Sequence, residues 1–245
     1  MTFLNWLKRK IRSGRGVRAP EFSDEFLKGE FETLQIKAFP QMPELNVLLI
    51  ADTHGCFEIF WKDDEDLPPL DAVIILGDLE INDLNSILNR CKGVPVYAIC
   101  GNHDTPELYK NPGVTYIHGI DVWINGYRIV GWHGSFKYKD TQNHCFSQAE
   151  SEAFADDLPS CDILITHDAA YGSRFSTDSV NHPGLKGIKK YLKEMRPVIH
   201  LHGHLHNPGI EEICGVPSVC VYKFGLLTVK GGQLSYKRLA EHPFF

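Results

Sequence analysis

The chain has 245 residues, of which 43% are apolar, and a formal net charge of −6. This length is enough to bury a full hydrophobic core, and the absence of any run of 18 apolar residues argues against a transmembrane segment. Seven cysteines without CxxC spacing favour reduced thiols in a cytoplasmic protein over a disulfide framework.

The N-terminal segment carries a concentrated positive charge. Residues 1–18 contain six Lys or Arg and no acidic residue. We expect residues 1–20 to form a flexible basic arm; the alternative is a short amphipathic helix that contacts anionic lipid or nucleic acid. Residues 21–44 are expected to connect this arm to a domain over 45–245, with TLQIKAF as a candidate edge strand. The acidic remainder of the chain argues against a broad nucleic-acid-binding surface.

Five apolar runs along the domain each end in a cluster of Asp, His, Asn and Gly. Continuous Val, Ile and Leu predict strands that are covered on both faces, as in layered α/β proteins. The five runs are NVLLIADTHG, DAVIILGDLE, VPVYAICGNHD, CDILITHDAA and VIHLHGHLH. Because ligands bind beyond the carboxyl ends of strands in open α/β sheets, these polar ends predict a functional site.

Helices and hairpins are predicted between and after these runs. DLNSILNRC, SQAESEAFADDL and HPGLKGIKKYLKEM predict helices; Ser147 and Glu150 form a capping box at the second, and Pro183 lies near the start of the third. VTYIHG, DVWINGYRIVGWHG and VPSVCVYKFGLLTVKGGQLSYKRL predict hairpins. Asn125-Gly126 and Gly231-Gly232 are their expected tight turns.

The polar ends in chain order resemble the motif set of the calcineurin-like metallophosphoesterase superfamily. That set is D-x-H, G-D, G-N-H-D or G-N-H-E, a single H, and G-H-x-H. The chain contains it in order as ADTHG, LGDLE, CGNHD, ITHDA and HGHLH, over residues 51–206. The resemblance implies an α/β fold, a four-layer α-β-β-α sandwich of two mixed β-sheets flanked by helices, with a dinuclear metal site at the carboxyl ends of the strands.

The resemblance also implies which residues hold the metal ions. The first ion takes Asp52, His54 and His206, the second takes Asn102, His167 and His204, and Asp78 bridges both. Oxygen and nitrogen ligands without thiolate suit Mn, Fe or Zn, with Co or Ni as alternatives. Each residue alone also has an ordinary explanation, since an Asp after a strand is often a turn or cap residue.

Further residues are candidates for catalysis and substrate binding. His103 is expected to protonate the leaving oxygen or to steady the phosphoryl oxygens, and Asp104 either orients that imidazole or caps a helix. Arg174, together with Ser173 and Lys186 in the 171–187 stretch, is a candidate phosphate contact, and His133 in GWHGS is expected to line the cleft. Of the remaining histidines, His202 is a candidate support for the ligands, whereas His200 is expected in the core.

The resemblance implies hydrolysis of phosphoric esters by attack of a metal-bound hydroxide. GDLEIND and GNHD stand where protein serine/threonine phosphatases have GDxVDRG and GNHE, so the chain resembles small phosphodiesterase-type members, with a small molecule or nucleotide as substrate. Three alternatives remain. One is a nuclease and another is a non-enzymatic interaction scaffold of the retromer-subunit type, which typically loses a catalytic His or a ligand. An HD-type phosphohydrolase, the third, is disfavoured because that fold is helical.

Overall fold

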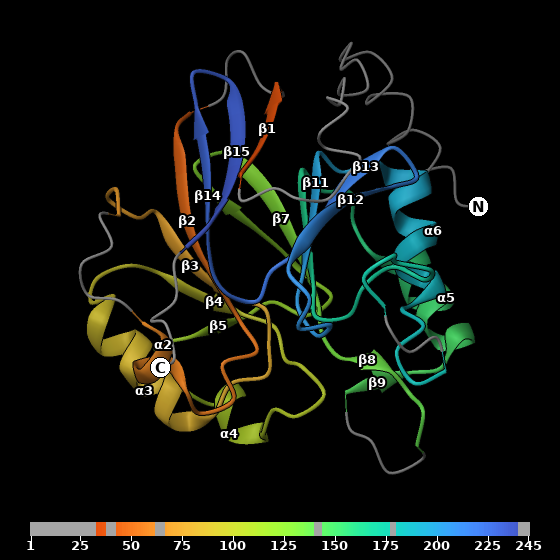
Figure 1. The fold of residues 1–245 in the computed structure, drawn as a ribbon, viewed down its shortest axis with the longest axis horizontal. Coiled ribbons are helices and arrows are strands. Elements are labelled where there is room, and N and C mark those ends of the chain that lie inside the picture. The colour runs from red at the N-terminus through yellow and green to blue at the C-terminus, as the bar shows by residue number, and fades with distance from the viewer. Residues whose placement is uncertain (1–32, 38–42, 62–66, 140–143, 177–179, 240–245) are drawn as a thin grey trace.

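The computed structural model describes residues 33–37, 43–61, 67–139, 144–176 and 180–239. Two β-sheets lie face to face, with helices on the outer side of each (Figure 1). The helices are α2 (Phe57–Phe60), α3 (Ile81–Arg90), α4 (Pro106–Tyr109), α5 (Gln148–Asp157) and α6 (Lys186–Met195). This arrangement confirms the predicted four-layer α-β-β-α sandwich. The basic arm at residues 1–20 lies outside the described residues.

The first sheet has seven strands in the order β1-β15-β14-β2-β3-β4-β5. They are β1 (Thr33–Lys37), β15 (Gln233–Arg238), β14 (Lys223–Lys230), β2 (Leu45–Ala51), β3 (Ala72–Ile75), β4 (Val96–Ala98) and β5 (Thr115–Tyr116). Strands β2 to β5 are parallel, and β14, β15 and β1 extend the sheet in antiparallel pairs. The position of β1 confirms the edge strand predicted for TLQIKAF.

The second sheet has six strands in the order β12-β13-β11-β10-β7-β6. They are β12 (Gly209–Ile213), β13 (Val216–Cys220), β11 (Ile199–His202), β10 (Ile163–Thr166), β7 (Tyr127–Trp132) and β6 (Asp121–Ile124). The four inner strands are parallel and the two edge strands are antiparallel to their neighbours. A small separate pair joins β8 (Ser135–Phe136) to β9 (Cys145–Phe146).

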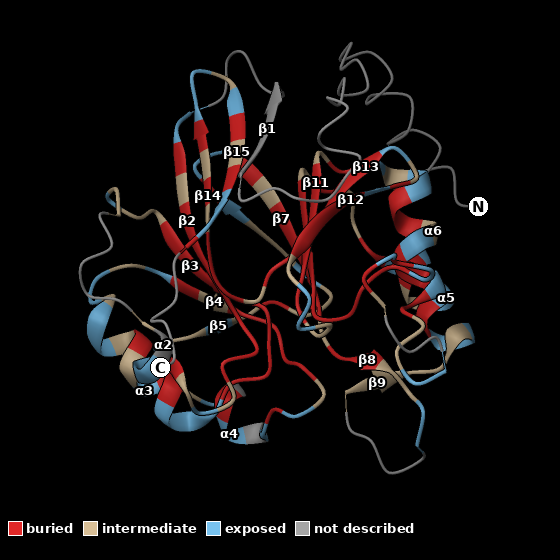
Figure 2. Cartoon of the chain, viewed as in Figure 1, coloured by how far each residue is buried: buried red, intermediate tan, exposed pale blue. Residues whose placement is uncertain are grey.

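Three hydrophobic clusters fill the three interfaces between the four layers. In β2, Val47 and Leu49 face the second sheet, whereas Leu48 and Ile50 pack toward α2 and α3. A third cluster packs α5 and α6 against the second sheet. Figure 2 shows β2, β3, β10 and β11 buried along most of their length, as their continuous apolar runs predict.

The hairpin predictions are partly correct. Asn125-Gly126 joins β6 to β7 and Gly231-Gly232 joins β14 to β15, all four with the positive φ that such tight turns require. The hairpin predicted to begin at Val216 is wrong in its first half, because β13 pairs with β11 in the second sheet and the chain then crosses to the first sheet. VTYIHG is also not a hairpin, since β5 pairs in parallel with β4.

The predicted helices are present with small differences. α5 has the expected capping box, in which Ser147 Oγ accepts from Glu150 N at 3.2 Å. α6 begins at Lys186, so Pro183 precedes it, and the four-residue helices α2 and α4 were not predicted. Among the described residues, no helix has the length and apolar character that crossing a membrane requires. All seven cysteines are free thiols, as the sequence predicts, and Cys100, Cys161 and Cys220 are buried.

Candidate metal centre

The five polar clusters meet where the carboxyl ends of both parallel sets of strands come together. Backbone hydrogen bonds tie the loops to one another: Asp52 N donates to Gly77 O at 3.0 Å, and Gly203 N donates to His167 O at 3.0 Å. Across the sheets, His204 N donates to Asp52 Oδ2 at 2.9 Å. Residues from β2, β3, β10 and β11 therefore share one edge of the sandwich, as the sequence predicts.

Asp52, His54 and His206 form the first group of candidate ligands. The Nε2 atoms of His54 and His206 lie 3.2 Å apart, and His206 Nε2 lies 3.4 Å from Asp52 Oδ1. A tetrahedral cation with bonds of about 2.0–2.1 Å holds its ligand atoms about 3.3 Å apart. Asp52 Oδ1 is buried without a hydrogen-bond partner, so a divalent cation fits this group.

Asp78, His167 and His204 form the second group, and Asn102 joins it. His167 Nε2 lies 3.5 Å from Asp78 Oδ2 and 3.1 Å from Asn102 Oδ1. The other ring nitrogen, His167 Nδ1, lies 2.8 Å from Leu76 O, to which it donates, so Nε2 is the nitrogen that faces the Asp78 carboxylate. All seven predicted ligands thus lie in two adjacent groups.

The ionisation of these residues suits cation binding. Burial lowers the pKa of His167, but the neighbouring Asp78 carboxylate outweighs it and raises the pKa to about 10. Burial lowers the pKa of His54 and of His204, while Asp78 acts against that shift in both. The charge of Asp78 therefore acts on histidines of both groups. In the metal-free protein a proton on His167 balances Asp78, and a bound cation would release that proton.

The glycines in the motifs leave room for the carboxylates. A Cβ on Gly101 would lie 1.9 Å from Asp78 Oδ1 and 2.6 Å from His167 Cε1. A Cβ on Gly203 would lie 2.6 Å from Asp52 Oδ2. Neither glycine has a positive φ, so what these positions require is space rather than conformational freedom.

Backbone strain is concentrated at the same residues. Five of the seven candidate ligands have positive φ, namely Asp52, His54, Asp78, His204 and His206, with values from 49° to 69°. Non-glycine residues rarely adopt this region, and they cluster in it at functional sites. The strained turns direct these side chains from the strand ends toward one another.

Two residues that the sequence did not single out support the first group. The Asp83 carboxylate, at the start of α3, accepts hydrogen bonds from Thr53 Oγ1 at 2.5 Å and Gly55 N at 2.7 Å. Lys223 is buried, and its Nζ donates to Asp52 O at 2.6 Å. An acidic residue in a first helical turn and a lysine at the start of a strand carry no local signal of such roles.

Asp104 contributes through the backbone. Its buried carboxylate accepts from Gly101 N at 2.6 Å, Leu79 N at 2.8 Å and Asp78 N at 3.1 Å. None of its hydrogen bonds within the described residues reaches the His103 ring, and the N-cap of α4 is Thr105. Both expected roles, orienting His103 and capping a helix, are therefore wrong. Asp104 instead holds the GD and GNHD loops together.

His103 lies at the exposed side of the centre. Its backbone N donates to Asp78 Oδ1 at 2.9 Å, so its position is fixed by a candidate ligand of the second group. Its ring approaches the ring of His54, a candidate ligand of the first group, at 5.8 Å between centroids. The side chain is thus open to solvent above both groups.

The predicted substrate contacts, Arg174 and His133, are engaged with other parts of the chain. The Arg174 guanidinium donates to Ile210 O at 2.7 Å and stacks on Phe175. His133 hydrogen-bonds to Tyr116 Oη and stacks on His118, and burial lowers its pKa to about 2, so it brings no positive charge. Neither residue belongs to the two groups, and their roles in substrate binding stay predictions.

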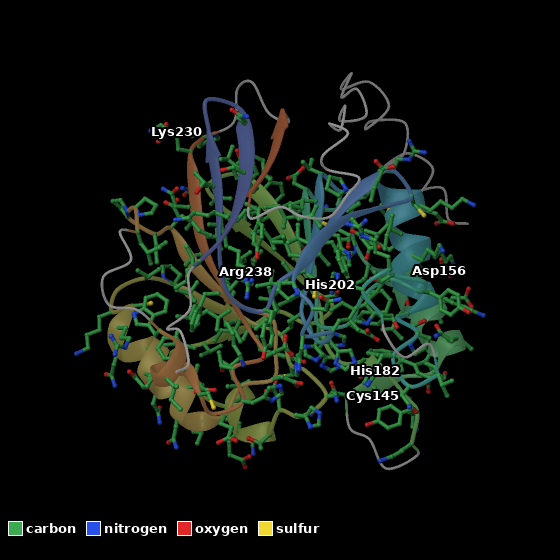
Figure 3. The ribbon with its side chains drawn as sticks, viewed as in Figure 1. Cys145, Asp156, His182, His202, Lys230 and Arg238 are labelled. Carbon is green, nitrogen blue, oxygen red and sulfur yellow. The ribbon has the colours of Figure 1, made fainter. Side chains whose placement is uncertain are left out.

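The other histidines of the VIHLH strand are buried. His200 lies between Thr166 Oγ1 at 2.8 Å and Ser218 Oγ at 2.7 Å, which confirms the core position expected for it. His202, labelled in Figure 3, contacts Gly203 O through Nδ1 at 3.1 Å. Its Nε2 is buried without a partner, so no hydrogen bond links it to a candidate ligand.

Comparison with known proteins agrees with this geometry. Residues 45–245 match the calcineurin-like phosphoesterase superfamily domain. The chain belongs to that superfamily. It is 23% identical to an uncharacterized protein of Haemophilus influenzae, over 65% of this chain and 83% of that protein. The crystal structure of TT1561 of Thermus thermophilus superimposes with a TM-score of 0.55 at 14% identity, covering 80% of this chain and 99% of that one, and so shares the superfamily fold.

Proposed function

We propose that the chain is a phosphoesterase that requires two divalent cations, with Mn, Fe or Zn favoured over Co or Ni. The proposal is carried by one observation: seven candidate ligands with oxygen or nitrogen donors gather in two adjacent groups, and one buried oxygen among them, Asp52 Oδ1, has no hydrogen-bond partner. Two bound cations polarise a phosphoryl group and activate water. The protein's own residues then select and orient the ester.

Charge supports an anionic ester as the substrate. Asn102 and the histidines are neutral ligands, so only Asp52 and Asp78 bring negative charge to two divalent cations. The loaded site is therefore positive and attracts phosphate. Arg174 is the one arginine on the described loops that carry the candidate ligands, and its guanidinium is bound to β12. A diester carries one negative charge and a monoester up to two. The small number of positively charged side chains near the candidate ligands therefore favours phosphodiesters.

We assign the proton donor to His103. It is exposed, and its backbone is fixed to Asp78, a residue shared electrostatically by both groups. A general acid in this position protonates the leaving oxygen as negative charge develops on it. Asp78 is assigned to hold both cations, and Asp104 to keep the Asp78 loop against the GNHD loop.

The proposed function is tested on purified protein loaded with Mn²⁺ or Zn²⁺. The substrates are bis-p-nitrophenyl phosphate, p-nitrophenyl phosphate, cyclic nucleotides and a single-stranded oligonucleotide. We expect metal-dependent turnover, faster on the diester than on the monoester. Preference for the oligonucleotide would favour the nuclease alternative. Two bound cations without turnover of any ester would favour the interaction scaffold.

Variants separate the residue roles. His103→Gln should retain both cations and lose about 10²–10⁴-fold in activity on alkyl esters, with a smaller loss on nitrophenyl esters, whose leaving group needs no proton. Asp78→Asn should weaken binding of both cations and slow every ester. An equal loss on both ester classes in His103→Gln would remove the proton-donor role and leave this side chain as a stabiliser of the phosphoryl oxygens.

A further inference from the structure

The segment that returns from the 171–187 loop to α6 is fixed beside the second group of ligands. Residues 183–185 run along residues 169–172, which directly follow the ligand His167. The backbone bonds are Leu185 N to Ala169 O at 2.9 Å, Tyr171 N to Leu185 O at 3.0 Å and Gly172 N to Pro183 O at 3.1 Å. This attachment determines where the preceding residue, His182, can lie.

His182 contacts a candidate metal ligand. Its Nδ1 lies 2.9 Å from Nε2 of His204, with the two rings 4.8 Å apart and close to perpendicular. On the backbone side, Ser176 Oγ donates to His182 O at 2.5 Å. The side chain, labelled in Figure 3, is half-buried and belongs to none of the family motifs.

Only one proton can lie between these two nitrogens. If His204 Nε2 carries it, then His204 Nδ1 holds the lone pair that a cation needs. If His182 Nδ1 carries it, the lone pair of His204 Nε2 accepts the hydrogen bond. Nδ1 of a neutral His204 then carries a proton and has no lone pair for a cation. The two arrangements therefore differ in whether His204 is ready to bind a cation.

We infer that His182 is a positioning residue that accepts the Nε2–H of His204 and so presents Nδ1 of His204 to the second cation. His167 shows the same arrangement, because its Nδ1–H donates to Leu76 O and leaves Nε2 for the ligand group. Partners of this kind fix the tautomer and ring orientation of a metal-binding histidine, and losing one typically weakens metal affinity by about 10–100-fold. The inference rests on the proposed two-cation centre.

The chain offers a matched pair of variants at this position. His182→Asn places an amide oxygen where Nδ1 of the imidazole was and keeps an acceptor for His204. His182→Leu has similar bulk and no acceptor. In a His206→Ala background the first group is incomplete, so that binding to the second group is measured separately.

Two measurements test the inference. In metal-free wild type, long-range ¹H–¹⁵N spectra should show His204 as the Nε2–H tautomer, and an Nδ1–H tautomer would overturn the inference. In Mn²⁺ titrations by calorimetry, His182→Leu should weaken the second group about 10–100-fold, while His182→Asn stays close to wild type. Equal affinities in wild type and His182→Leu would also overturn it. If wild type binds two cations, the proposed function survives either failure; if it binds none, both proposals fall.

Discussion

Gly101→Ala tests whether the space at the GNHD loop is reserved for the Asp78 carboxylate. The added Cβ would lie 1.9 Å from Asp78 Oδ1, whereas Cβ atoms in proteins essentially never lie within 3.0 Å of such an atom. One of the two must therefore retreat by about 1 Å, whereas metal–ligand distances tolerate only about 0.2 Å. Asp78 cannot retreat freely, because its carboxylate also contacts His103 N at 2.9 Å and His167 Nε2 at 3.5 Å.

We expect Gly101→Ala to lose binding of both cations and at least about 100-fold in turnover, the cost that 1 Å of misplacement carries in an active site. Calorimetric Mn²⁺ titration and hydrolysis of bis-p-nitrophenyl phosphate measure the two effects. Gly113→Ala is the matched control: its φ is also not positive, and its Cβ would meet only the end of the Leu88 side chain, at 3.1 Å, and the Asn111 side chain, at 3.2 Å. Wild-type cation affinity and turnover in Gly101→Ala would refute the reasoning.

Three further predictions concern other parts of the chain. Lys223→Met should lower the affinity of the first group for its cation about tenfold in calorimetry, because it removes the donor to Asp52 O. The affinity of the second group should stay unchanged. Burial lowers the pKa of His118 to about 4, so between that pH and about 6.5 the unfolded chain binds more protons and acidification destabilises the fold. This lowers the free energy of unfolding by at most about 3 kcal/mol before solvent screening is considered. In urea unfolding at several pH values, the free energy of unfolding of His118→Gln should depend less on pH than that of wild type. Deleting residues 1–18 should leave turnover of a small diester unchanged; a large loss would place the arm in the catalytic domain.

The sequence predicts the layers and the grouping of the candidate ligands because both depend on regular geometry. An unbroken apolar run such as VLLI must be covered on both faces, and the carboxyl ends of parallel strands must meet at one edge. The chain crossing after Cys220 is not predictable in this way, because VCVYKFGLL has the pattern of one extended stretch whether it stays in one sheet or changes sheets. The partners of the ligands are also hidden, since Lys223 is 171 positions from Asp52 in the chain.

The roles of the buried acids follow from backbone chemistry rather than from catalysis. Asp83, Asp104 and Asp168 each look like catalytic candidates, because they are acidic, buried and next to the centre. Yet each carboxylate accepts hydrogen bonds from backbone N–H groups: two or more in each case, from loops that carry ligands or lie beside them. Such bonds hold loops whose own peptide groups cannot pair in a sheet.

These anchors explain how the centre keeps an unfavourable backbone. A non-glycine residue in the left-handed region costs about 1–2 kcal/mol, and five candidate ligands occupy that region. Asp83 fixes the loop that follows Asp52, Lys223 fixes the Asp52 carbonyl, and Asp104 fixes the amide of Asp78. The strained turns are therefore held by Asp and Lys side chains that lie outside the two groups of candidate ligands. It follows that the ligand atoms are directed at one another before any cation binds, which lowers the reorganisation that cation and substrate binding would otherwise require.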